Sequence, residues 1–143
     1  MTICLAYAPT EPGRAALRHC AAEARATASE VVVVNATREW RDSIPVELTH
    51  EEAAHLTEVM TDAGVPWRWA QQTDGVTGAD AIIGVAEDED VSLVVIGITD
   101  RSHVEKRIVS DTTKQVLLDA PCAVLAVRAD HAAPDLRQSH PAR

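Results

Sequence analysis

Of all segments in this sequence, a short loop with one glycine and two carboxylates is the most similar to a phosphate-binding site in its residue types and spacing. The apolar run Leu93–Gly97 predicts a buried strand that ends in a glycine, and the run starting at Ser110 predicts a helix after a polar loop. Such strand–loop–helix units bind phosphate through backbone N–H groups when glycines allow close approach. Asp100, Ser110 and Asp111 stand where small neutral residues would be expected. The sequence therefore has the frame of a phosphate site without its chemistry.

Electrostatics argues against a bare triphosphate in this loop. A carboxylate about 5 Å from a phosphate charge is repelled by roughly 3 kcal/mol at an effective dielectric constant of about 20, and Asp100 and Asp111 supply two carboxylates. An alternative stays open, because an aspartate can hold Mg²⁺ and recruit phosphates through the metal. Lys106 and Arg107 could offset the charge or form an exposed basic pair, and His103 could act on a ligand or simply lie in an exposed loop.

No other group of residues specifies an enzyme or a metal site. Cys4, Cys20 and Cys122 are far apart and form no C-x-x-C pair, so they are interpreted as small core side chains. His50 and His55 are five residues apart, which places them about 140° apart around a helix and favours exposed positions over a zinc pair. Nucleophile-elbow and Walker lysine motifs are missing. We predict no catalytic residue and no metal.

Composition bounds the class of protein. A chain of 143 residues with 46% hydrophobic content suits one compact domain, predicted over residues 1–128, with residues 129–143 as a polar mobile tail. The formal charge of −9 argues against a nucleic-acid partner, since phosphate binding needs clustered Lys and Arg. The apolar run Val31–Val34 is far shorter than the ~20 residues of a membrane span. We expect an acidic cytoplasmic protein with no membrane association.

Five apolar runs predict the strands that position the loop. The β-branched run Val31–Val34 is typical of a strand buried on both faces, whereas Pro66 and Arg68 are tolerated at a sheet edge. Trp67 and Trp69 are expected to share one face. The predicted strands are Ile3–Tyr7, Val31–Val34, Val65–Ala70, Leu93–Gly97 and Cys122–Val127.

Capping residues predict where the helices begin and end. Thr10 is the expected N-cap of a helix that runs to about Ala28, and Thr49 starts a T-x-x-E capping box for a helix that ends at Gly64. A third helix is predicted along Ala79, Ile82, Ile83 and Ala86, and the fourth opens at Ser110.

Two further segments are interpreted from their polar residues. The acidic run Glu87–Asp90 is interpreted as a solvated helix end that adds solubility and no stability. Ala36–Val46 is predicted to be a polar connection. The alternation of strands and helices predicts an α/β fold, a doubly wound parallel sheet with helices on both faces.

Four segments resemble the universal stress protein family. Ile3–Tyr7 is similar to the family's first strand, Glu11–Leu17 to the start of its first helix and Leu93–Gly97 to its fourth strand. Ala120–Arg128 is similar to the closing A-P-C-P-V-L-V-V-R pattern, which is the most specific of the four matches. The resemblance covers the chain up to Arg128 and implies five strands in the order 3-2-1-4-5.

The resemblance also implies a degenerate nucleotide slot. Members that bind ATP carry G-x2-G-x9-G-[S/T] after the fourth strand, and only the glycine at Gly97 is kept here. The D-G-S that usually ends the first strand reads Ala8-Pro9-Thr10, and Ala36 would supply a backbone contact to adenine. The predicted slot consists of Tyr7, Ala8, Thr10, Ala36, Gly97, Asp100, Ser110, Asp111 and Thr112.

The last strand suggests a partner. It contains six apolar residues with no Lys, Pro or charge, and at a sheet edge they would be unprotected. Because family members commonly dimerise through this strand, the resemblance implies a homodimer, while a helix or the C-terminal tail over the edge is the alternative. The predicted dimer strand includes Ala123, Val124, Leu125, Ala126 and Val127.

Two functions follow from these observations. The favoured one is a non-enzymatic stress-response protein that needs no cofactor and acts through dimerisation and contacts with a protein partner. The alternative is an adenine-nucleotide sensor, with or without slow ATP hydrolysis, that binds ATP and Mg²⁺ through a variant loop around Gly97 and Asp111-Thr112.

Overall fold

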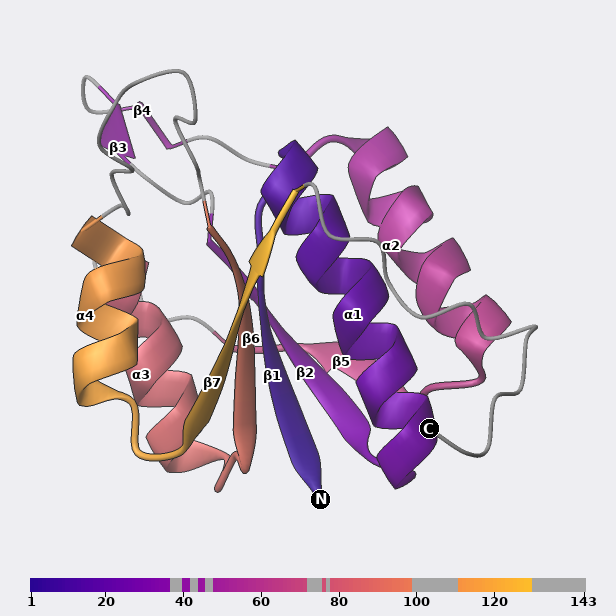
Figure 1. Ribbon diagram of the computed structural model, residues 1–143. Helices are drawn as coiled ribbons and strands as arrows, with labels where there is room; N and C mark the ends of the chain where they lie inside the picture. The colour runs from indigo at the N-terminus through magenta and orange to yellow at the C-terminus, as the bar shows by residue number, and fades with distance from the viewer. Residues whose placement is uncertain are drawn as a thin grey trace.

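A five-stranded parallel sheet forms the centre of the molecule. The computed structural model describes residues 1–36, 40–41, 44–45, 48–71, 76, 78–98 and 111–129. The strands lie in the order β5-β2-β1-β6-β7, so the third, second, first, fourth and fifth predicted strands are neighbours as expected (Figure 1). Their bounds are Trp67–Trp69 (β5), Glu30–Asn35 (β2), Thr2–Tyr7 (β1), Leu93–Ile98 (β6) and Ala123–Arg128 (β7).

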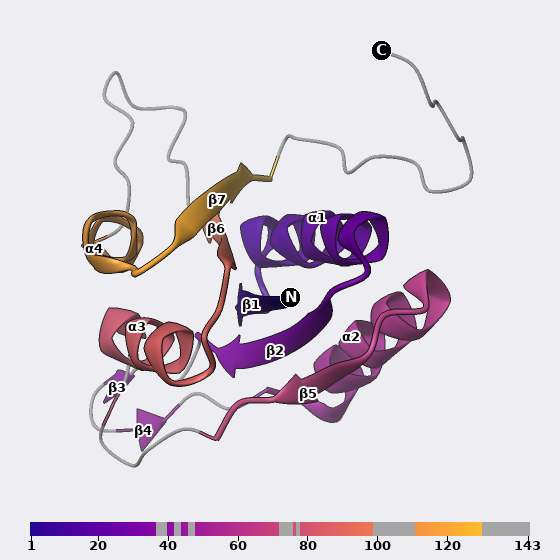
Figure 2. The same cartoon turned by 90° about the horizontal axis from the view of Figure 1, so that it is seen from below.

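Helices cover both faces of this sheet. Helices α1 (Glu11–Thr27) and α2 (His50–Ala63) pack on one face, and α3 (Gly78–Asp88) and α4 (Asp111–Asp119) pack on the other (Figure 2). The buried valines of β2 contribute side chains alternately to the two cores, because successive residues of a strand point to opposite faces. The doubly wound α/β prediction is confirmed.

The predicted helix caps are present. The side-chain oxygen of Thr10 accepts a hydrogen bond from the Gly13 N–H at 3.1 Å. Thr49 and Glu52 form the reciprocal capping box, with N···O distances of 3.2 and 3.0 Å. Gly64 ends α2 with φ = 67°, a left-handed conformation that glycine adopts without steric cost. These caps fix where α1 and α2 begin and where α2 ends.

Two details differ from the predicted elements. The third strand is shorter than expected, as β5 covers only Trp67–Trp69 within the predicted Val65–Ala70. The predicted connection Ala36–Val46 contains an antiparallel pair, β3 (Trp40–Arg41) and β4 (Ile44–Pro45). Strands of two residues are too short to give a recognisable alternation, which is why the sequence did not reveal them.

The acidic run Glu87–Asp90, at the carboxyl end of α3, is not only a solvated end. Glu89 forms an ion pair with Arg68 of β5, which joins the α3 turn to the sheet edge. The prediction that the whole run adds only solubility was therefore wrong for Glu89, since a tertiary partner cannot be read from charge alone. Both side chains are partly exposed, so the pair contributes at most about 1 kcal/mol.

Candidate functional site

The carboxyl ends of β1 and β6 form the switch point of the sheet. Strand β1 pairs with β2 on one side and with β6 on the other, and the chain winds in opposite directions from this point. Open α/β sheets bind ligands in the crevice beyond the strand ends at such a position. Residues that follow β1 and β6 are therefore the candidates for contact with a ligand.

Two glycines allow the start of α1 to lie against this switch point. A Cβ atom built on Gly13 would lie 1.8 Å from the carbonyl oxygen of Ala8, and one built on Gly97 would lie 2.5 Å from the carbonyl carbon of Pro12. Both distances are shorter than any real side chain tolerates. The structure thus brings Ala8, Thr10 and Gly97 together, and it gives Gly97 a packing role that needs no phosphate. The role of Gly13 was missed by sequence reasoning.

The backbone of Ala36 lies beside the end of β1. Its N–H donates a hydrogen bond to the carbonyl oxygen of Tyr7 at 2.8 Å, which extends the β1–β2 ladder by one residue. This N–H is therefore already engaged, and only the Ala36 carbonyl is left for an incoming adenine amino group. The Ala36 backbone can therefore contact adenine only as a hydrogen-bond acceptor.

The side chain of Tyr7 is part of the core. It is fully buried in the cluster formed by β1, α1 and α2, and its hydroxyl has no hydrogen-bond partner among the described residues. Burial raises the pKa of Tyr7, the nearby Arg14 lowers it, and Glu52 raises it further. The phenol is therefore neutral at pH 7, and its ring packs beneath the helices instead of facing the crevice.

The Tyr7→Phe variant is expected to be as stable as the wild type or up to about 1 kcal/mol more stable. A buried hydroxyl without a partner carries a desolvation cost of about 1–3 kcal/mol, and phenylalanine fills the same space without it. Urea denaturation of the two proteins measures the difference. A loss of more than about 1 kcal/mol would mean that the hydroxyl makes a hydrogen bond that matters.

The amino ends of α3 and α4 lie side by side. A Cβ atom on Gly78 would be 3.8 Å from the Thr112 hydroxyl, and the Gln115 side-chain amide donates to an Asp80 carboxylate oxygen at 3.3 Å. Helix amino ends attract anions, but Asp111 already places an exposed carboxylate on the first turn of α4. Asp100, His103, Lys106, Arg107 and Ser110 lie outside the described residues.

The cysteines are placed as the sequence predicted for Cys4 and Cys20, both of which are fully buried. Burial raises the pKa of the Cys4 thiol to about 12, and it raises the pKa of Cys20 and of the half-buried Cys122 as well. Neutral thiols are poor nucleophiles and poor metal ligands.

His50 and His55 are exposed, as expected.

Two further features concern metals and membranes. The described residues contain no cluster of three or more His, Cys, Asp or Glu side chains that could hold a metal ion. In the same part of the chain, no helix combines the length and the apolar character that a membrane crossing requires.

The fold and the strand order define a class, the doubly wound α/β proteins. The sequence profile of the universal stress protein family matches residues 1–128. A universal stress protein of Mycolicibacterium smegmatis is 32% identical over 131 residues, which cover 88% of this chain and 96% of that protein. This chain belongs to the universal stress protein family.

Solved structures show the same fold. A universal stress protein from Archaeoglobus fulgidus aligns with a TM-score of 0.69 at 23% identity, over 88% of this chain and 96% of that one. A universal stress protein from the same organism in complex with dAMP aligns with a TM-score of 0.63 at 20% identity, over 88% and 95% of the two chains. At these identities the likeness establishes the architecture alone.

Proposed function

We propose that this protein is a non-enzymatic stress-response protein whose nucleotide slot does not hold ATP. The observation that supports this most directly is the packing of Gly97, the one glycine that fits the ATP pattern, against Pro12 at the start of α1. The glycine is needed for this packing whether or not a phosphate binds. Asp111 adds an exposed negative charge where the triphosphate would lie. A cytoplasmic location stays a prediction from the acidic composition.

A second candidate is an adenine-nucleotide sensor. The relative in complex with dAMP favours it, because a monophosphate carries less charge toward Asp111 than a triphosphate does. In this case the Ala36 carbonyl would contact adenine and an aspartate would hold Mg²⁺. Titration calorimetry with ATP and with dAMP separates the candidates: binding of neither supports the first, and micromolar binding of either supports the second.

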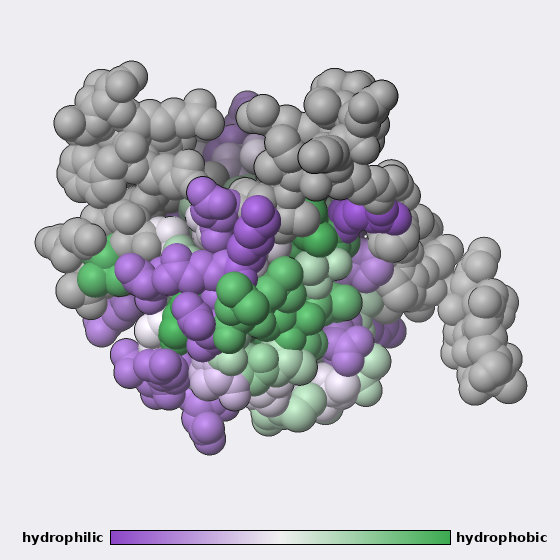
Figure 3. All heavy atoms as spheres, turned by 60° about the vertical axis from the view of Figure 1, so that its left-hand side comes forward, coloured by the Kyte–Doolittle hydropathy of each residue, from purple (hydrophilic) through white to green (hydrophobic). Residues whose placement is uncertain are grey.

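We further propose that β7 pairs with the β7 of a second copy. Strand β7 is the last in the sheet, with Leu125 37% exposed on it, and Leu117 and Leu118 are exposed on the neighbouring α4. Figure 3, which turns this side forward, shows apolar side chains gathered on this face. An open edge flanked by leucines is a surface that a second copy covers well.

The Leu125→Lys variant is expected to be monomeric at micromolar concentration, with dissociation of the dimer increased by about 100-fold or more. A lysine at this position would bury an unpaired charge in the interface. Size-exclusion chromatography with light scattering measures the mass. The matched control is Trp69→Lys, a residue with 39% exposure on the opposite edge strand, which should leave the dimer intact. A wild-type protein that is strictly monomeric contradicts the proposal.

A further inference from the structure

The opposite edge of the sheet, at β5, has backbone groups that the described residues leave open. The Val31 N–H donates to the Pro66 carbonyl at 2.9 Å, and the Ala70 N–H donates to the Val33 carbonyl at 2.8 Å. Because residues along a parallel strand bond alternately to either side, Arg68 bonds toward β2, whereas the N–H and C=O groups of Trp67 and Trp69 point outward. No strand in the described part of the chain pairs with this edge.

One face of this edge is aromatic. The rings of Trp67 and Trp69 meet in a T-shaped contact with centroids 5.5 Å apart and an interplanar angle of 77°. Trp67 packs on the core beneath α1 and α2, and this fixes the position of the more exposed Trp69. The exposed indole offers a flat surface for an apolar side chain, or for a cation above the ring.

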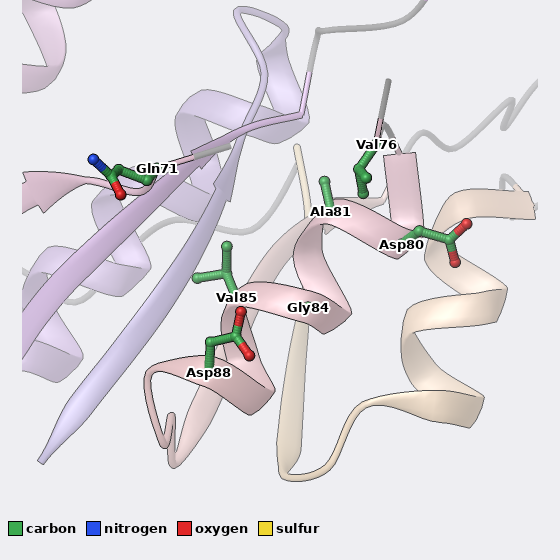
Figure 4. A pocket seen from close by; sticks show the side chains of 7 residues that line it. All are labelled: Gln71, Val76, Asp80, Ala81, Gly84, Val85 and Asp88. Atoms are coloured by element: carbon green, nitrogen blue, oxygen red, sulfur yellow. The ribbon is translucent and has the colours of Figure 1, made fainter. Parts of the chain in front are cut away.

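The other face of the edge is acidic. Here a pocket of about 60 Å³ lies between Gln71, two residues after β5, and helix α3 (Figure 4). Its apolar wall is formed by Val76, Ala81 and Val85, and it also includes Asp80 and Asp88. The volume is far below the roughly 300 Å³ of a small-molecule site. The apolar wall suits the aliphatic part of one Lys or Arg side chain, and a carboxylate suits its charged end group.

Charge selects the kind of segment that fits. Arg68 is the basic residue of β5, and its guanidinium is already paired with Glu89. Asp80 accepts a hydrogen bond from Gln115 of α4, so Asp88 is the pocket carboxylate for which the described residues provide no partner. A second copy paired through the same edge would bring like carboxylates together, which is unfavourable. At the β7 edge, by contrast, the neighbouring side chains are leucines.

We propose that the open edge of β5 binds an extended protein segment with Lys or Arg at alternate positions and apolar residues between them. The segment adds a strand to the sheet through the outward backbone groups of Trp67 and Trp69. Because its side chains alternate, one basic side chain enters the acidic pocket and the apolar ones lie on Trp69. The lining of this pocket includes no residue of the predicted nucleotide slot and none of β7.

The test uses a short fluorescein-labelled peptide of alternating lysine and valine, with a glutamate–valine peptide as control, measured by fluorescence anisotropy on the full-length protein. Asp88→Lys is expected to weaken binding by at least about tenfold. Glu58→Lys makes the same charge change at an exposed position on α2 and is expected to change binding by less than about twofold. Trp69→Ala should also weaken binding, without removing any carboxylate.

Backbone amide shifts locate the bound peptide. Shifts concentrated in residues 67–71 and 80–88 support the proposal. Equal weakening by both charge reversals, equal binding of the glutamate–valine peptide, or shifts concentrated in residues 123–128 would each overturn it. The first two results would mean attraction by net charge or nonspecific association, and the third would mean that the segment prefers the other sheet edge.

Discussion

The Gly13→Ala variant should lose about 3 kcal/mol of stability, the largest effect expected of any single methyl group in this protein. The added Cβ would lie 1.8 Å from the Ala8 carbonyl oxygen and 2.7 Å from its carbonyl carbon. Both are backbone atoms, so the β1–α1 turn must move as a whole, and overpacking of this kind costs about 1–3 kcal/mol or more. Guanidinium denaturation gives the free energy of unfolding directly.

Gly84→Ala is the matched control for this variant. A Cβ there would have no atom within 4 Å, and Gly84 lies inside α3, where alanine is favoured by up to about 1 kcal/mol. The same substitution is therefore expected to have opposite signs at the two positions. If Gly13→Ala were as stable as the wild type, the close approach of α1 to the end of β1 would be wrong.

The second large effect is a gain of ATP binding. Replacing Asp100 and Ser110 by glycine and Asp111 by serine restores the family's G-x2-G-x9-G-S pattern after β6. If each carboxylate lies about 5 Å from a phosphate charge, its removal relieves roughly 3 kcal/mol of repulsion. We expect the triple variant to bind ATP at least about 100-fold more tightly than the wild type, as measured by titration calorimetry.

A control for overall charge accompanies this experiment. The double variant Glu58→Gln/Asp62→Asn removes two negative charges from exposed positions on α2. Helix α2 packs on the face of the sheet opposite to α4, the helix that Asp111 begins. It should not gain ATP binding. If the triple variant bound ATP no better than this control, the carboxylates would not be what limits ATP binding.

Much of the fold could be predicted because its signals are local. Four consecutive valines in β2 indicated a strand buried on both faces, and Thr10 and Thr49 indicated helix starts through their own side-chain chemistry. The edge position of β5 followed from Pro66 and Arg68. Each of these inferences needed only neighbouring residues, and each was confirmed.

The candidate site was harder to predict because its geometry depends on contacts between distant segments. Gly97 looked like a phosphate residue, yet its contact with Pro12 depends on how α1 crosses β6. Tyr7 looked like a slot residue, yet its ring points under α1 and α2. The pairing of Glu89 with Arg68 likewise joins residues 21 positions apart. None of these relations leaves a pattern in the sequence.

The central claim, that the slot does not hold ATP, is tested most directly by titrating the purified, nucleotide-stripped wild-type protein with ATP, with and without Mg²⁺. We predict no measurable heat of binding at millimolar ligand under either condition, which directs attention to protein partners at β7 and β5. Micromolar binding would contradict the claim, and binding only with Mg²⁺ would assign a metal-bridging role to Asp100 or Asp111.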